Sequence, residues 1–176
     1  MQSKKRGLAL RNSKGFTLIE LLIVIAIIAI LAAVAFVALD PLSRFQDARD
    51  SARWADVNAL ISAIRVDQVD NKGLYLAEID AAVVSTEYMI SGDTPAPGAG
   101  CDVGCGAFVA GAADCIDLSG LVDDGYLGQM PVSPNGGAGG AWDNTHSGYY
   151  MIKNGNGSVT VGACEAEGDD PIIVTR

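Results

Sequence analysis

The sequence has little of what catalytic and nucleic-acid-binding sites commonly use. It contains one histidine, His146, and its aromatic content is 6%. Basic side chains are also scarce beyond the N-terminal region, since residues 41–176 carry seven Lys and Arg against 19 Asp and Glu, a net charge of −12. Because phosphate contacts need many basic side chains, this balance excludes a broad nucleic-acid-binding surface there. No nucleophile, base and orienting acid occur together, so we predict no enzyme, no catalytic residue and no cofactor.

The first 39 residues have a different composition. Residues 1–15 contain five basic side chains and no acid, and residues 16–39 then form an apolar run of 24 residues with one ionisable group, Glu20. As a helix this run would be about 36 Å long, enough to cross a hydrocarbon core of about 30 Å, so residues 16–40 are the predicted transmembrane and assembly helix. All its flanking positive charges lie on the N-terminal side, so residues 1–15 are expected to stay in the cytoplasm while residues 40–176 are exported. The five basic residues are Lys4, Lys5, Arg6, Arg11 and Lys14.

An ordinary secretory signal is the first alternative, because Ala33-Val34-Ala35 offers a small-x-small cleavage pattern. About 20 apolar residues precede that site, whereas the hydrophobic region of a signal peptide has about 7 to 15. The length therefore favours a helix that is retained in the mature protein.

The residues that open the apolar run are Gly15-Phe16-Thr17-Leu18-Ile19-Glu20, directly after Lys14. This segment resembles the class III signal of the type IV pilin and pseudopilin family. The resemblance implies that a prepilin peptidase cleaves between Gly15 and Phe16 and N-methylates Phe16, leaving the apolar helix on the mature protein. The 15-residue leader is longer than usual, and the helix lacks the internal proline common in pilins, so the subclass stays open.

Glu20 lies near the start of the predicted membrane helix. An isolated acid in such a helix costs on the order of 2.5 to 3.5 kcal/mol, so it usually has a partner. Cleavage would expose the amino group of Phe16 four residues away, and the two groups would pair between adjacent subunits. The alternative is that Glu20 extends to the cytoplasmic interface without a specific partner. The resemblance favours the assembly role for Phe16 and Glu20.

A second, amphipathic helical pattern covers residues 41–72. Apolar residues recur at three- and four-residue steps. Charged residues at three-residue steps suggest a solvated face, and in a packed fibre the same residues would instead pair between subunits. Pro41 is expected to kink or locally open a helix of about 80 Å in total, which should end at Asn71-Lys72-Gly73. The apolar positions are Trp54, Val57, Ile61 and Ile64, and the charged ones are Arg44, Asp47, Asp50, Arg53 and Asp56.

Residues 73–176 form the predicted exported head, in which 18 of the 21 glycines lie at or beyond Gly92. Tyr149–Ile152 and Ser158–Cys164, joined by an Asn-Gly-rich turn, predict a β-hairpin. A further strand is expected within residues 172–175 and a short helix or turn within residues 118–127. The predicted fold class is α+β, with a long N-terminal helix packed against a small antiparallel sheet, an arrangement similar to pilins.

Four cysteines lie in the predicted exported part, where two disulfides and no metal are expected. Their spacing leaves all three pairings open and does not give paired zinc knuckles. Acidic residues could supply calcium ligands, but no EF-hand pattern is present and a solvated surface is favoured. Asn156-Gly157-Ser158 also matches a glycosylation sequon. The cysteines are Cys101, Cys105, Cys115 and Cys164, and the acidic candidates are Asp123, Asp124, Asp143, Asp169 and Asp170.

The resemblance implies a structural subunit of a type IV pilus-like filament, assembled from an inner-membrane pool into an extracellular fibre. Its implied partners are other copies in a helical filament, the prepilin peptidase, a pilus or secretion assembly platform, and the membrane. A type II secretion pseudopilin and a minor pilin are alternatives within the family. A membrane-tethered or secreted ligand-binding domain is the alternative from another class.

Overall fold

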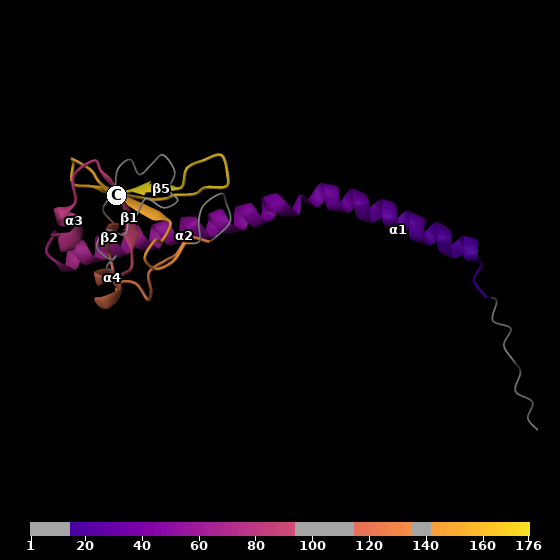
Figure 1. Cartoon of the computed structure of the whole chain (residues 1–176), viewed down its shortest axis with the longest axis horizontal. Helices are drawn as coiled ribbons and strands as arrows, with labels where there is room; N and C mark the ends of the chain where they lie inside the picture. The colour runs from indigo at the N-terminus through magenta and orange to yellow at the C-terminus, as the bar shows by residue number, and fades with distance from the viewer. Residues whose placement is uncertain (1–14, 94–114, 135–141) are drawn as a thin grey trace, which may run out of the picture. The chain divides into compact units, whose positions relative to one another are not determined.

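The computed structural model describes residues 15–93, 115–134 and 142–176 (Figure 1). The chain divides into two compact units, Met1–Pro41 and Leu42–Arg176. The first unit contains one helix. The second unit is α+β and is called the head below; it holds the second helix as well as residues 73–176.

Helix α1 spans Leu18–Leu39, and every residue in it except Glu20 is apolar. None of its residues is buried. It ends at Asp40, which has a left-handed conformation with φ 33° and ψ 74°. The residue before a proline is disfavoured in the right-handed helical region, and proline suits the first turn of a new helix. The local opening expected next to Pro41 is therefore found at Asp40.

Helix α2 spans Pro41–Asp70 and buries one face against the rest of the head. The prediction that Trp54 belongs to this face was wrong, because Trp54 is 41% exposed and Arg53 is completely buried. The predicted end is confirmed, since the Gly73 N–H donates to Gln68 O at 2.7 Å and Gly73 has φ 95°. The buried residues of α2 are Arg53, Val57, Leu60, Ile61, Ala63, Ile64 and Asp67.

The five described strands form one sheet in the order β2-β1-β3-β4-β5. Strand β1 (Glu87–Ser91) pairs antiparallel with β3 (Tyr149–Lys153), but it pairs parallel with β2 (Cys115–Asp117). The expected wholly antiparallel sheet is thus corrected to a mixed one. Parallel neighbours need a connection of about a dozen residues or more, and the chain between β1 and β2 is long enough to provide it.

The C-terminal hairpin is confirmed. Strand β4 (Val159–Ala163) pairs antiparallel with β3, and β5 (Ile173–Thr175) adds the expected further strand. The turn closes with Asn154 N–H donating to Ser158 O at 2.8 Å, and Gly157 takes φ 82°, a value that favours glycine. Two short helices complete the described head, α3 (Ala77–Ala81) and α4 (Gly120–Asp123), the latter within the segment where a short helix was expected.

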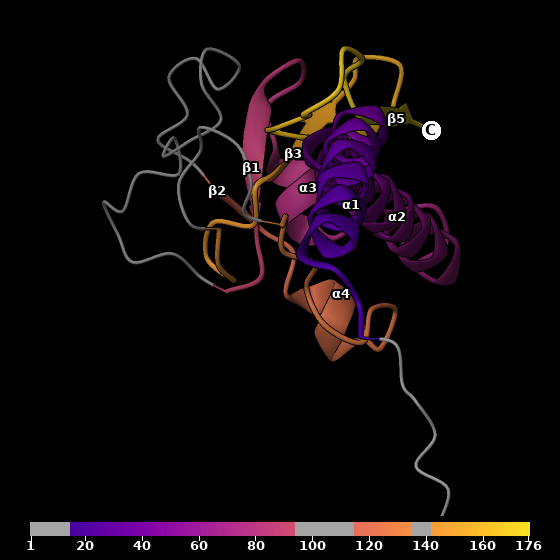
Figure 2. The same cartoon turned by 90° about the vertical axis from the view of Figure 1, so that its right-hand side faces the viewer.

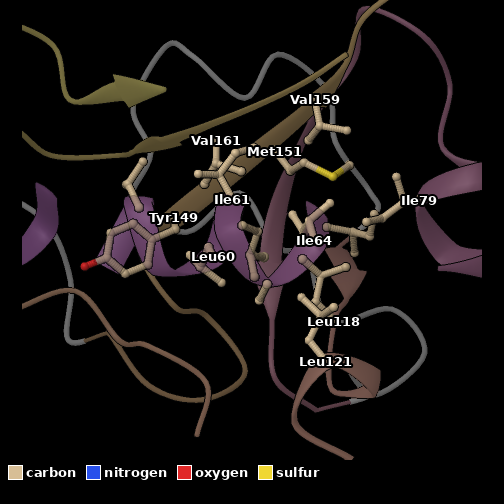
Figure 3. Packing of buried hydrophobic residues seen from close by; sticks show 14 of the residues in the cluster. Leu60, Ile61, Ile64, Ile79, Leu118, Leu121, Tyr149, Met151, Val159 and Val161 are labelled. Carbon is tan, nitrogen blue, oxygen red and sulfur yellow. The ribbon is translucent and has the colours of Figure 1, made fainter. Parts of the chain in front are cut away.

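The main hydrophobic core lies between α2 and the sheet, whose strands gather along one side of that helix (Figure 2). Leu60, Ile61 and Ile64 of α2 face Tyr149 and Met151 of β3 (Figure 3). Burial of each large aliphatic side chain stabilises the fold by roughly 1.5 to 3 kcal/mol. The α+β class is confirmed, and the second helix with the sheet forms the head.

Candidate processing and assembly site

The N-terminal end of α1 is closed by a reciprocal capping box between Thr17 and Glu20. The Glu20 N–H donates to Thr17 Oγ1 at 3.3 Å, while the Thr17 N–H donates to Glu20 Oε2 at 2.8 Å. The Thr17 hydroxyl also donates to Oε2, at 2.7 Å. This pattern satisfies backbone N–H groups that lack partners in the first helical turn. The Glu20 carboxylate is therefore held at the start of the helix by its own chain.

All atoms of this capping box lie on the C-terminal side of the Gly15–Phe16 bond. Phe16 is 88% exposed, and a Cβ added at Gly15 would meet no atom within 4 Å. Hydrolysis of this bond would thus leave Thr17 and Glu20 in contact. The role of Thr17 was not predicted, although Thr-x-x-Glu before an apolar run is the sequence signature of a capping box.

The surface of α1 is apolar on all sides. Its 22 residues correspond to about 33 Å, and its length and composition suffice to cross a membrane. A helix without a polar face is stable only among lipids or other apolar groups. Because no residue of α1 is buried among the residues that the structure describes, its apolar surface requires an environment of that kind.

The head contains a buried cluster of charged side chains around Arg53. The Arg53 guanidinium is inaccessible to solvent and donates to Asp50 Oδ1 at 2.7 Å and to Glu167 Oε1 at 3.0 Å. It also donates to Ser133 Oγ at 3.0 Å and to the carbonyl oxygen of Pro134 at 2.9 Å. The expectation of a solvated face is therefore wrong for Arg53, whose partners are Asp50 on the same helix and residues of two distant loops.

The same cluster holds the β4–β5 loop against α2. Arg49 pairs with both oxygens of Glu167, and Asp50 Oδ2 accepts the backbone N–H groups of Glu167 at 3.0 Å and Gly168 at 2.8 Å. Hydrogen bonds from Arg49, and then from Arg53, lower the pKa of Glu167 to about 2. These contacts fix the position of a loop, and Arg49, Asp50, Arg53 and Glu167 all find partners within the cluster, so the cluster is structural.

Two of the four cysteines belong to the described residues. Cys115 on β2 and Cys164 just after β4 are partly buried beside Met89 and Trp142, and neither is a free thiol. Cys101 and Cys105 lie outside the described residues. The expected pair of intramolecular disulfides and its connectivity therefore stay predictions.

The acidic candidates do not converge on one site. Asp123 and Asp124 line a cavity of about 480 Å³ together with Glu78 and Asp117. Asp143 instead accepts the backbone N–H groups of Thr145 and His146, each at 2.8 Å, within its own turn. In the ranges that the structure describes, no group of three or more His, Cys, Asp or Glu side chains is arranged to hold a metal ion. Asp169 and Asp170 are exposed.

Residues 10–36 match the family model described as the prokaryotic N-terminal methylation motif. This range contains the Gly15–Phe16 bond, the capping box and most of α1. No curated protein and no solved structure matches the chain. The motif and the apolar helix together indicate a membrane-anchored precursor, and the motif is typical of structural proteins rather than enzymes.

Proposed function

We propose, from the class III signal motif of type IV pilins and pseudopilins in residues 10–36, that this protein is a structural subunit of a type IV pilus-like filament. The observation that carries the proposal is that three features occur together in and directly before α1. They are the matched motif, an accessible Gly15–Phe16 bond, and a membrane-length helix whose single carboxylate is held at its N-terminal end.

In this proposal a prepilin peptidase cleaves between Gly15 and Phe16 on the cytoplasmic side and methylates the new amino group of Phe16. The basic leader supports this orientation, because positive flanking charge is retained in the cytoplasm. The precursor is then held in the inner membrane by α1, with the head exported. Cleavage leaves the Thr17–Glu20 capping box in place and exposes a cation beside it.

Assembly follows from the electrostatics of the apolar helix. The Glu20 carboxylate of one copy accepts a hydrogen bond from the charged Phe16 amino group of a neighbour. The cost of a charge in an apolar environment is thereby offset by an opposite charge. Thr17 is a positioning residue, because its N–H and hydroxyl both hold Oε2 of Glu20. The copies form a helical filament that an assembly platform extracts from the membrane and extends outside the cell.

The first test is the mass of the native N-terminus. Methylated Phe16 as the first residue is the expected result. A mature chain that begins at Phe36 would instead show ordinary secretory cleavage and would refute the proposal. Recovery of the processed chain as the main component of surface filaments identifies a major pilin, whereas short periplasmic assemblies or trace amounts identify a pseudopilin or a minor pilin.

The second test separates membrane insertion from assembly. Glu20→Ala makes α1 more apolar, so we expect processed protein to accumulate in the membrane while filament yield falls sharply. Asp169→Ala, which removes an exposed acid from the head, is the control and should leave yield unchanged. Methylation of Phe16 is measured in parallel. Normal filament yield from Glu20→Ala as the only subunit would show that Glu20 has no role in assembly.

The exported location also predicts two intramolecular disulfides among Cys101, Cys105, Cys115 and Cys164. Thiol labelling of the denatured, unreduced protein should detect no free cysteine. Four reactive thiols with one bound zinc ion per chain would contradict this prediction.

A further inference from the structure

The tip of the β3–β4 hairpin contains two Asn-Gly pairs, Asn154-Gly155 and Asn156-Gly157. An asparagine followed by glycine is open to attack by the next backbone nitrogen on its side-chain amide, because glycine has no Cβ to obstruct the approach. The two pairs share a sequence, but their side chains have different surroundings. The structure therefore distinguishes between residues that the sequence alone makes equivalent.

Asn156 is exposed, and its side-chain carbonyl is polarised from two directions. Its Oδ1 accepts the Ser158 N–H at 3.0 Å and the Ser158 hydroxyl at 2.8 Å. Attack on the amide carbon places negative charge on this oxygen, so both donors are already directed at the atom where charge develops. Its Nδ2, the nitrogen that must leave, forms no hydrogen bond with the described part of the chain.

In Asn154 the amide nitrogen, rather than the amide oxygen, forms the side-chain hydrogen bonds. It is half-buried, and its Nδ2 donates to Ser158 Oγ at 3.0 Å and to Thr160 Oγ1 at 2.9 Å. Loss of this nitrogen breaks both hydrogen bonds. Attack at Asn156 breaks one backbone hydrogen bond, because the Gly157 N–H must leave the carbonyl oxygen of Asn154, 3.0 Å away in an exposed turn.

We propose that Asn156 is a site of spontaneous deamidation in the folded protein. The Gly157 nitrogen loses its proton and forms a bond to Cγ of Asn156, the bond from Cγ to Nδ2 breaks, and ammonia leaves. Water then opens the cyclic imide to aspartate or isoaspartate, so water is the only co-reactant. Either product adds one negative charge to the hairpin tip. The isoaspartate form also lengthens the backbone beside Gly157, whose carbonyl oxygen accepts the Tyr75 hydroxyl at 2.8 Å.

The first experiment compares the two asparagines within one chain. The full-length protein is incubated folded at mildly alkaline pH, and peptide mass spectrometry measures conversion at each position. The same chain in denaturant gives the reference, in which both Asn-Gly pairs should react at similar rates. We expect conversion in the folded protein to be several-fold faster at Asn156 than at Asn154. Equal conversion, or faster conversion at Asn154, would overturn the proposal.

Two variants test the mechanism. Ser158→Ala removes a donor from Asn156 and an acceptor from Asn154, so conversion should fall roughly two- to tenfold at Asn156 and rise at Asn154. Thr160→Val removes an acceptor from Asn154 alone and should raise conversion only there. General loosening of the hairpin would speed both positions in Ser158→Ala, and that result would contradict the assigned role of Ser158.

Discussion

Replacing Arg53 by alanine removes four hydrogen bonds, those to Ser133, Pro134, Asp50 and Glu167, from the interior of the head. Breaking a buried ion pair by deleting one partner typically costs 3 to 5 kcal/mol, because the remaining charge is left uncompensated. Part of the cluster survives here. Glu167 keeps Arg49, and Asp50 keeps two backbone N–H groups.

Glu165 is the carboxylate most affected by the Arg53→Ala change. Its Oε2 is buried without a hydrogen bond within the described residues, and it lies 3.8 Å from the Arg53 guanidinium. We therefore place the loss at about 3 kcal/mol, the lower end of the range for a broken buried pair. This loss is a large fraction of the stability expected for a domain of this size.

The measurement is denaturant unfolding of the full chain in detergent, followed through the fluorescence of Trp54 and Trp142, both of which lie in the head. The midpoint should fall, while the dependence on denaturant stays unchanged. Arg44→Ala, which alters an exposed arginine on the same helix, is the matched control and should change stability by no more than about 0.5 kcal/mol. A loss below about 1 kcal/mol for Arg53→Ala would show that the cluster contributes little net stability and would refute this reasoning.

Three further predictions concern the head. The pKa of Glu167 is lowered from 4.5 to about 2, so its contribution to stability is present above pH 4.5 and is lost as the pH falls toward 2. In Glu167→Gln the free energy of unfolding, taken from unfolding curves, should therefore depend less on pH across that window. Gly162→Ala places a Cβ 2.5 Å from the buried Tyr150 ring and should cost about 1 to 3 kcal/mol in thermal unfolding, whereas Gly128→Ala meets nothing within 4 Å and should be nearly neutral. Burial raises the pKa of Asp67 above its ordinary 3.8, so stability falls as pH rises from 3.8 through the raised pKa. Asp67→Asn should remove that loss and stabilise the head at neutral pH. An unchanged dependence of stability on pH in this variant would contradict the raised pKa of Asp67.

Features that depend on neighbouring residues could be predicted from the sequence. The length of α1 follows from the apolar run, and the end of α2 follows from Gly73, which takes the left-handed conformation that closes a helix. The β3–β4 hairpin follows from alternating apolar residues around Asn-Gly turn chemistry. In each case the determining contacts lie within a few positions along the chain.

Features that depend on distant residues could not be predicted in the same way. Arg53 is buried because it meets Glu167, 114 positions later, and Ser133, 80 positions later. Periodicity alone assigned the neighbouring Trp54 to the buried face, since an arginine is almost never fully buried without partners. The parallel pairing of β2 with β1 likewise depends on the path of the chain between them rather than on either strand's own sequence.

The apolar core of the head is buried, whereas the apolar side chains of α1 are exposed, and this difference bears on the proposed assembly. The head completes its core with α2 and the sheet, while α1 buries none of its residues. Moving α1 from lipid to the apolar helices of neighbouring copies yields little hydrophobic free energy, because both surroundings are apolar. Shape and polar contacts must therefore select the position of each copy. Glu20 is the only polar side chain of α1, and Thr17 already fixes its carboxylate. In the proposed assembly, a shift of neighbouring helices along their axes would therefore separate the Phe16 amino group of one copy from the Glu20 carboxylate of the next.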